Sequence, residues 1–453
     1  MKTILIVISR GFLARNIITT GVLQELLKRP QTRIVFCVPK GTAAFLRKEV
    51  PGEMLVFEEY AEHPTTKLRK VLIFFLRYST INRTTINLAW YGSGKARQYK
   101  WIYGLSFPFL FLIGIFPWSR SIFQYLEAVL FPDTHYDFFL KKYTPDLVLL
   151  TNIVGQLDIA FIKAARRHAV RAIAMTKGWD NLDKYHMQIK ADKLIVQAQP
   201  LREYASRYQG YSPADVFVGG FPAFDIYHSP ETLLSRDEVC VRFGLDPTRK
   251  ILFYGSEGVW SSNDDAIVED IIRWMHEDVF DMPCSLILRP HFSEVSHHRF
   301  VRFRGMSHVF VYDQLRLVPG FVDLWYPDAD EVRLFASSIM HSDVMLCVRS
   351  TLTLDAIQCD RPVINFTTRA YLEKNGRDST SNLYEHTFYR DLLRLGAVNL
   401  VPGDKDMIPA INACLKDPGA KSMERDIVRK VYCNEASEPS SHEKIAQYVL
   451  SFL

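Results

Sequence analysis

The chain contains 453 residues, of which 48% are hydrophobic and 23% are charged, and its formal net charge is +5. At about 150 residues per domain this length predicts two or three domains, and the composition excludes a disordered chain, a collagen and a disulfide-stapled scaffold. The seven cysteines are scattered without zinc-ligand spacing, which favours buried thiols in a reducing compartment.

The N-terminal half alternates between predicted strands and helices. Residues 3–8 predict a buried strand and not a signal peptide, because the apolar run is short and Arg10-Gly11 follows it. We therefore expect a cytoplasmic protein. The apolar patterns predict further strands at 33–38, 54–57, 147–150, 171–175 and 193–196. They predict helices at 12–27, 43–50, 122–142 and 157–168.

Residues 63–126 interrupt this alternation with a basic and strongly apolar segment. It contains nine Lys or Arg residues and neither Asp nor Glu. Its longest apolar run, 101–118, barely reaches the length of a membrane span, and Pro108 and Pro117 argue against one continuous transmembrane helix. Two interpretations stay open: the segment lies on an anionic membrane surface, or its helices pack on their own domain with solvated charges. No nucleic-acid-binding motif accompanies the charge, so we expect no nucleic acid partner.

A second alternating series begins at residue 250. It predicts strands at 251–254, 285–288, 308–311, 344–347 and 362–366. It predicts helices at 264–276, 330–340, 351–358, 382–394, 405–416, 424–432 and 441–452. Continuous apolar strands that alternate with helices are typical of parallel sheets covered on both faces.

The two series predict an α/β chain of two doubly wound, Rossmann-like domains that face a cleft. The domains are expected at 1–225 and 250–453, with the basic insertion at about 63–126 and a polar linker at 226–249. The last helix could pack back on the N-terminal domain.

Polar residues at the carboxyl ends of the strands are the first site candidates, because ligands of open α/β sheets bind there. An arginine can bind phosphate, and a histidine can bind phosphate or act as a catalytic acid, which makes His291 a catalytic candidate. A Ser-Thr turn that opens a helix attracts anions, and a carboxylate can accept hydrogen bonds from sugar hydroxyls. In the C-terminal domain the candidates are Gly255, Ser256, Glu257, Arg289, His291, Arg349, Ser350, Thr351 and Asp355.

The strand ends of the N-terminal domain face the same cleft. They carry Arg10 and Gly11 after the first strand, and Trp179, Asp180 and Asn181 after the strand at 171–175. Asp180 is a candidate general base, because a carboxylate can take a proton from an attacking hydroxyl. Its alternative role is an Asx turn or a helix cap.

No metal site is expected. The sequence Asp328-Ala329-Asp330 resembles the metal-binding DxD of some sugar transferases, but it precedes a helix, where capping explains it better. The chain has no GxGxxG fingerprint and no Walker A loop. We therefore expect no required cofactor.

Five blocks of sequence, taken in order, resemble the GT-B glycosyltransferases of bacterial surface-polysaccharide assembly, including relatives that transfer glycerol phosphate from CDP-glycerol. The blocks are GWDNL (178–182), ADKLIV (191–196), VGGFPAFD (218–225), RPH (289–291) and the stretch 342–364, which contains RST and DRPVI. Phe292 stands where the glycerophosphate relatives usually carry a second Pro, and the glutamate pair of many retaining enzymes is missing.

The resemblance implies a nucleotide-activated donor bound by the C-terminal domain, with His291, Ser350 and Thr351 at phosphate and Asp355 at the sugar or ribose. It places the acceptor on the N-terminal domain, near Arg10, Gly11, Trp179 and Asn181. The implied activity is metal-independent transfer of a sugar to a lipid-linked or growing glycan, at the inner face of the plasma membrane. The alternatives are a glycerophosphotransferase, a nucleotide-sugar 2-epimerase and a non-catalytic membrane-associated scaffold.

Overall fold

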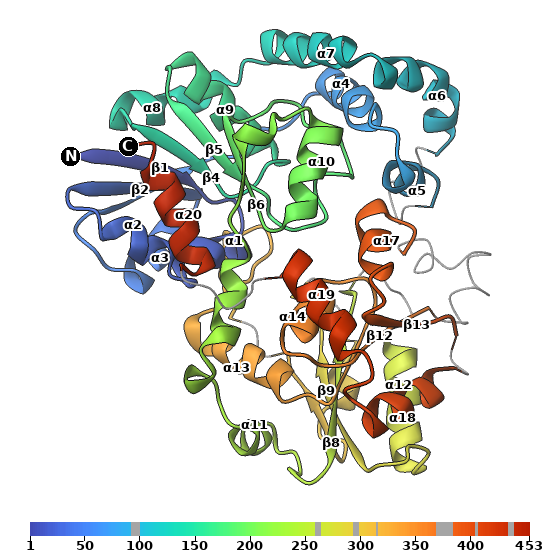
Figure 1. Ribbon diagram of the computed structural model, residues 1–453. Coiled ribbons are helices and arrows are strands. Elements are labelled where there is room, and N and C mark those ends of the chain that lie inside the picture. The colour runs from blue at the N-terminus through green and yellow to red at the C-terminus, as the bar shows by residue number, and fades with distance from the viewer. Residues whose placement is uncertain are drawn as a thin grey trace.

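Two parallel sheets organise the chain, one in each domain (Figure 1). This computed structural model describes residues 1–91, 100–258, 264–292, 299–313, 316–367, 384–403, 406–433 and 439–453. The two doubly wound domains predicted from the sequence are confirmed.

The N-terminal sheet has seven strands in the order β3-β2-β1-β4-β5-β6-β7. In chain order the strands are β1 (Lys2–Val7), β2 (Thr32–Pro39), β3 (Leu55–Tyr60), β4 (Leu147–Leu150), β5 (Arg171–Met175), β6 (Lys193–Val196) and β7 (Val216–Val218). Both faces are apolar: Leu5 and Val7 of β1 pack into one core, and Ile4 and Ile6 pack into another. Helices must therefore cover both faces, which explains why the strands read as continuous apolar runs.

The C-terminal sheet has six parallel strands in the order β10-β9-β8-β11-β12-β13. In chain order these are β8 (Lys250–Gly255), β9 (Cys284–Arg289), β10 (Val309–Val311), β11 (Val344–Cys347), β12 (Val363–Phe366) and β13 (Val398–Val401). The sequence patterns did not predict β7 or β13.

Two helices predicted as continuous are broken. The helix expected at 12–27 is divided into α1 (Gly11–Ile18) and α2 (Val22–Leu27) at Gly21, whose φ of +94° ends the helical path. The helix expected at 122–142 is divided into α7 (Pro117–Leu130) and α8 (Asp137–Tyr143) around Pro132, which cannot continue a helix. The other helices on this sheet are α3 (Ala43–Glu49), α9 (Gln156–Arg167) and α10 (Gln199–Gln209).

The C-terminal domain is covered by helices at or near the predicted positions. They are α12 (Asp264–His276), α13 (Ala329–Met340), α14 (Leu352–Gln358), α17 (Thr387–Leu393), α18 (Met407–Lys416) and α19 (Ser422–Tyr432). Positions 382–383 and 405 of two expected helices lie outside the described residues. Within the expected linker, a capping box of Ser235 and Glu238 begins α11 (Arg236–Phe243). The last helix, α20 (Ser441–Leu450), lies against α2 on the N-terminal domain (Figure 1).

The insertion forms four helices beside the N-terminal sheet: α4 (Lys67–Tyr78), α5 (Arg83–Tyr91), α6 (Lys100–Ile115) and α7. A small core of Ala89, Tyr103 and Leu110 joins α5 to α6. Residues 92–99, with Lys95 and Arg97, lie outside the described part. Among the described helices, none is long and apolar enough by itself to cross a membrane.

Candidate functional site

A cavity of about 290 Å³ lies between the two domains. Its walls come from α1, the end of β5 and the segment Pro222–His228 on one side, and from the carboxyl ends of β8, β9 and β11 on the other. Six predicted site residues line it: Ser256, Arg289, His291, Ser350, Thr351 and Asp355. The strand ends of both domains therefore meet at one site, as the parallel topology requires.

Two cations of the N-terminal domain reach into this cavity. Arg15 extends from α1, and Lys177 follows β5 directly. Among the described residues neither has an ion-pair or hydrogen-bond partner for its side chain, and Arg15 Nε is buried. Burial lowers the pKa of both groups from the ordinary value. Two half-buried positive charges that form no direct ion pair among the described residues make the cavity attractive to an anion.

Asp355 faces these cations from the C-terminal domain. Tyr227 donates a hydrogen bond from its hydroxyl to Asp355 Oδ1 at 2.8 Å. Burial raises the pKa of Asp355 to about 6, although Tyr227 and the charge of Arg15 oppose this shift. The pair offers a carboxyl and a phenol to a ligand hydroxyl. Next to it, Ser350 accepts a hydrogen bond from the Leu352 N–H at 3.3 Å, so this hydroxyl helps to cap α14.

Arg289 is held within its own domain. Its guanidinium donates to the Tyr312 carbonyl at 3.2 Å and to Glu331 Oε1 at 3.1 Å, and it stacks over the Tyr312 ring at 4.2 Å. Arg289 therefore acts on the cavity mainly through its charge. Burial, aided by that charge, lowers the pKa of His291 to about 4, so this imidazole is neutral at pH 7.

An aromatic wall lies next to His291. The His291 ring packs on Phe292 at 4.0 Å, and Phe292 stacks between Trp325 at 5.5 Å and Phe12 at 6.1 Å. Flat apolar surfaces of this kind pack well against a nucleobase or the apolar face of a sugar.

The glycine turn after β8 is organised by a carboxylate that the sequence analysis did not select. Asp264 accepts hydrogen bonds from the Ser256 hydroxyl at 2.6 Å and from the Glu257 N–H at 2.8 Å. A Cβ on Gly255 would lie 2.1 Å from Leu352 Cδ1, so the Leu352 side chain would have to shift to admit it. Of these turn residues, Ser256 lines the cavity and Gly255 and Glu257 do not.

The loop after β5 holds the two domains together. Trp179 is buried against Phe388 at 4.8 Å, Tyr389 at 5.6 Å and Tyr432 at 5.7 Å, all from the C-terminal domain. Asn181 accepts a hydrogen bond from the Gly178 N–H at 3.1 Å, which closes the turn. Neither residue lines the cavity.

Asp180 lies in the same loop and is ion-paired with Lys184. Burial alone would raise its pKa, but the charges of Lys184, Arg349 and Lys177 hold the pKa well below its usual range. A carboxylate that is this strongly stabilised is a weak proton acceptor. Arg349 donates a hydrogen bond from Nη1 to His386 Nδ1 at 3.2 Å and, like Asp180, is not part of the cavity lining.

The Arg10-Gly11 turn also meets the opposite domain. Asp323 accepts hydrogen bonds from the Gly11 N–H at 2.9 Å and from the Phe12 N–H at 3.2 Å. A Cβ on Gly11 would lie 1.8 Å from the Trp325 carbonyl oxygen. Gly11 and Phe12 therefore join the two domains through their backbone, and Arg10 and Gly11 are not part of the cavity lining.

Three residues of the site region escaped the sequence analysis. Lys177 directly follows a strand and could have been selected on that ground. Arg15 lies one turn inside α1, where an arginine is ordinarily solvated. Asp158, in the first turn of α9, is an acid on an apolar helix; burial raises its pKa to about 8 and Arg10 and Lys177 are its charged neighbours.

Capping explains Asp328, as expected: its carboxylate accepts a hydrogen bond from the Glu331 N–H at 2.9 Å at the start of α13. Among the described residues, one cluster has the composition and spacing of a metal site, formed by Glu25, His442 and Glu443. It lies at α2 and α20, outside the cavity.

Comparison with known proteins identifies the class of fold. No family model and no curated protein sequence matches the chain. The chain is similar along its whole length to a putative UDP-N-acetylglucosamine 2-epimerase from Listeria monocytogenes, with a TM-score of 0.56, 11% identity and 96% of that chain covered. It is also similar to a glycosyltransferase from Rickettsia africae (TM-score 0.52, 10% identity, 100% of this chain and 97% of that chain). A third similar structure is a variant of the wall teichoic acid polymerase TagF (TM-score 0.51, 10% identity, 99% and 88%).

These similarities show that the chain has the GT-B fold, with its two Rossmann-like domains and the cleft between them. They do not select one reaction, because an epimerase, a glycosyltransferase and a polymerase share this architecture.

Proposed function

We propose that the protein is a glycosyltransferase that moves a sugar from a nucleotide-activated donor to a hydroxyl of a lipid-linked or growing surface glycan. The observation that carries the proposal is the pair of cations Arg15 and Lys177, which face Asp355 and Ser350 across the interdomain cavity. Among the described residues neither cation forms an ion pair or a side-chain hydrogen bond. Two phosphates supply the missing negative charge, and Asp355 with Tyr227 binds a hydroxyl of the donor.

In this proposal the acceptor oxygen attacks the anomeric carbon of the donor, and the bond between that carbon and the phosphate oxygen breaks. The electron pair leaves with the nucleotide, where Arg15 and Lys177 stabilise the negative charge without a required metal. We place the acceptor proton on His291 in preference to Asp180. The imidazole is already neutral, and the adjacent phosphate charge would stabilise the imidazolium that forms.

The test is nucleotide binding by calorimetry with UDP, CDP, GDP, CMP and dTDP. We expect one nucleotide to bind selectively, and Arg15→Gln or Lys177→Gln to weaken it by roughly tenfold each, since a charge-assisted contact is worth about 1.5–3 kcal/mol. Lys48→Gln, an exposed substitution on α3 and remote from the cavity, is the matched control. Equal affinity in all variants would refute the assignment. Transfer activity that survives EDTA would support the metal-independent mechanism.

The second candidate comes from the structural neighbours, one of which is an epimerase and another a teichoic acid polymerase. A 2-epimerase converts the donor sugar without an acceptor, whereas a transferase releases nucleotide only when a suitable acceptor is present. CMP release from CDP-glycerol that requires a polyol-phosphate acceptor would indicate glycerophosphate transfer. Lipid binding without affinity for any of these nucleotides would favour the non-catalytic scaffold.

A further inference from the structure

The exposed apolar side chains of this protein are concentrated on α6 and α7. Fourteen of the 29 large hydrophobic residues that are exposed in the described chain fall between residues 101 and 130. The most accessible are Leu105 at 85%, Trp101 at 73%, Tyr125 at 67% and Trp118 at 62%. Single exposed hydrophobic residues are ordinary, but a group of this size on two consecutive helices indicates a binding surface. We call this surface the apolar platform.

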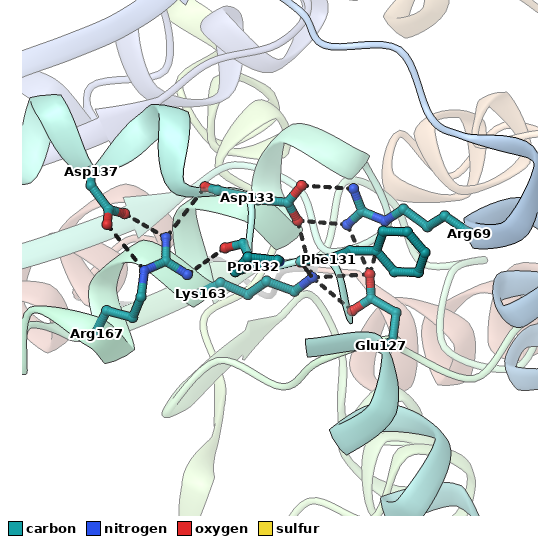
Figure 2. Close-up of polar contacts among 8 residues, drawn as sticks. All are labelled: Arg69, Glu127, Phe131, Pro132, Asp133, Asp137, Lys163 and Arg167. Atoms are coloured by element: carbon teal, nitrogen blue, oxygen red, sulfur yellow. Dashed lines mark hydrogen bonds and ion pairs between the residues drawn. The ribbon is translucent and has the colours of Figure 1, made fainter. Parts of the chain in front are cut away.

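A buried charge cluster fixes the orientation of the platform (Figure 2). Arg69 of α4 bonds Glu127 of α7 at 2.9 Å and Asp133 at 2.6 Å. Lys163 of α9 bonds the same two carboxylates at 2.8 and 3.0 Å, and donates to the Phe131 carbonyl at 2.6 Å.

The four side chains of this cluster are almost entirely buried, and their two positive and two negative charges cancel. The cluster pins one face of α4 and α7 to α9, so the opposite face of α7 must remain outward. Turning α7 to hide its apolar side chains would leave buried charges unpaired.

The charge around the platform favours one kind of occupant. The sequence between residues 63 and 126 contains no acidic residue. Lys67 and Lys70 of α4 are exposed, and among the described residues neither has an acidic partner; Leu68 and Val71, also exposed, alternate with them. Cations interleaved with apolar side chains match the boundary between anionic lipid headgroups and acyl chains.

The bend in the platform fits docking on a membrane surface and does not fit a helix that crosses the membrane. The segments Trp101–Ile115 and Trp118–Leu130 have the length and composition of a membrane span only when taken together, and they are bent by 104°. Tryptophan and tyrosine side chains, which prefer the interface between water and hydrocarbon, lie on this bent pair.

We propose that the apolar platform, with Lys67 and Lys70 beside it, docks the protein on a bilayer surface that contains anionic lipid. Leu105, Trp118 and Tyr125 enter the interfacial region, and the two lysines lie at the headgroups. This inference is independent of the proposed transferase activity, because lipid binding requires neither donor nor acceptor.

The test is co-sedimentation of the full chain with vesicles of equal parts phosphatidylcholine and phosphatidylglycerol. We expect binding to weaken at least tenfold in the triple variant Leu105→Ser, Trp118→Ser, Tyr125→Ser, because serine removes the apolar surface that each side chain would bury in the bilayer interface. The matched control replaces three exposed hydrophobic residues of the C-terminal domain, Val241, Met423 and Ile427, by serine and should bind like the wild type.

The electrostatic part has its own variant. Lys67→Gln with Lys70→Gln should weaken binding about fivefold for each lysine and only on vesicles with phosphatidylglycerol, since each basic residue near an anionic surface contributes about a factor of five. Lys40→Gln with Lys48→Gln is the control. Equal vesicle binding by the triple variant and its control would overturn the proposal. The proposal would also be overturned if the wild type does not bind vesicles and instead forms a dimer that the triple substitution dissociates. The platform would then bind a second copy of the chain.

Discussion

Gly11 shows how one backbone position can join two domains. Its N–H group donates to Asp323 of the opposite domain, and its missing side chain lets the Trp325 carbonyl approach. Gly11→Ala would place a methyl group 1.8 Å from that oxygen, and backbone atoms on both sides cannot move away cheaply. We expect the free energy of unfolding to fall by about 1–3 kcal/mol, as for other overpacked sites, in chemical denaturation.

The control for this prediction is Gly403→Ala. A Cβ on Gly403 has nothing within 4 Å, and its backbone is not in the left-handed region, so its effect should stay within about 0.5 kcal/mol. Equal stability of the two alanine variants would show that the domains can separate at Gly11 without cost.

The expectation that ligands bind at the carboxyl ends of the strands located six residues of the cavity, but not their hydrogen-bond partners or charge states. Ser350, His291 and Asp355 follow parallel strands, so topology alone brings them together. This expectation could not show that Glu331 engages Arg289 or that Arg15 enters from a helix of the other domain, because both depend on how segments distant in the sequence approach.

The helix α9 carries two basic residues four positions apart with different surroundings (Figure 2). Lys163 is 3% exposed between Glu127 and Asp133, whereas Arg167 is 31% exposed and pairs with Asp137. Lys163→Met removes one charge of a buried cluster and leaves an excess carboxylate, so we expect a loss of about 3–5 kcal/mol in the free energy of unfolding.

Arg167→Gln, on the same helix, breaks a partly exposed ion pair with Asp137 and hydrogen bonds to the Pro132 and Asp133 carbonyls. It leaves no buried carboxylate unpaired and should cost only about 1–2 kcal/mol. Hydrogen exchange should also speed up in α4 and α7 of the Lys163 variant and not in the Arg167 variant. If both substitutions have the same small effect, the cluster is not what holds the insertion in place.

Strands and helices were predicted correctly where the apolar residues formed a continuous run or a clear helical period. The strand at 193–196 and the helix at 264–276 match β6 and α12, because each is a sustained apolar run or an amphipathic period. The insertion was recognised as basic and apolar, yet its sequence could not show that Arg69 is buried in an ion cluster while Lys67 and Lys70 remain exposed.

Across the whole molecule, the insertion touches both domains. Thr84 of α5 donates to Asp183 of the N-terminal domain and accepts from the Thr387 N–H of α17 at 2.8 Å. Asp183 also accepts from the Phe388 N–H at 3.3 Å. One buried carboxylate therefore joins the insertion, the N-terminal domain and the C-terminal domain, and its protonation affects all three.

Burial raises the pKa of Asp183 to about 6, above the value of about 3.9 in an unfolded chain. Between these values the folded state binds the proton more readily, so lowering the pH from 7 to 4 should stabilise the wild type through this group by up to about 3 kcal/mol. Asp183→Asn removes the titration, and its free energy of unfolding relative to the wild type should fall by that amount over the same window.

Asp180→Asn, in the same loop, should show no such trend above pH 4, because Lys184, Arg349 and Lys177 keep the pKa of Asp180 below this range against the opposing effect of burial. Parallel pH profiles for the wild type and Asp183→Asn would mean that Asp183 is ionised in both states and that the three-way contact carries a buried charge.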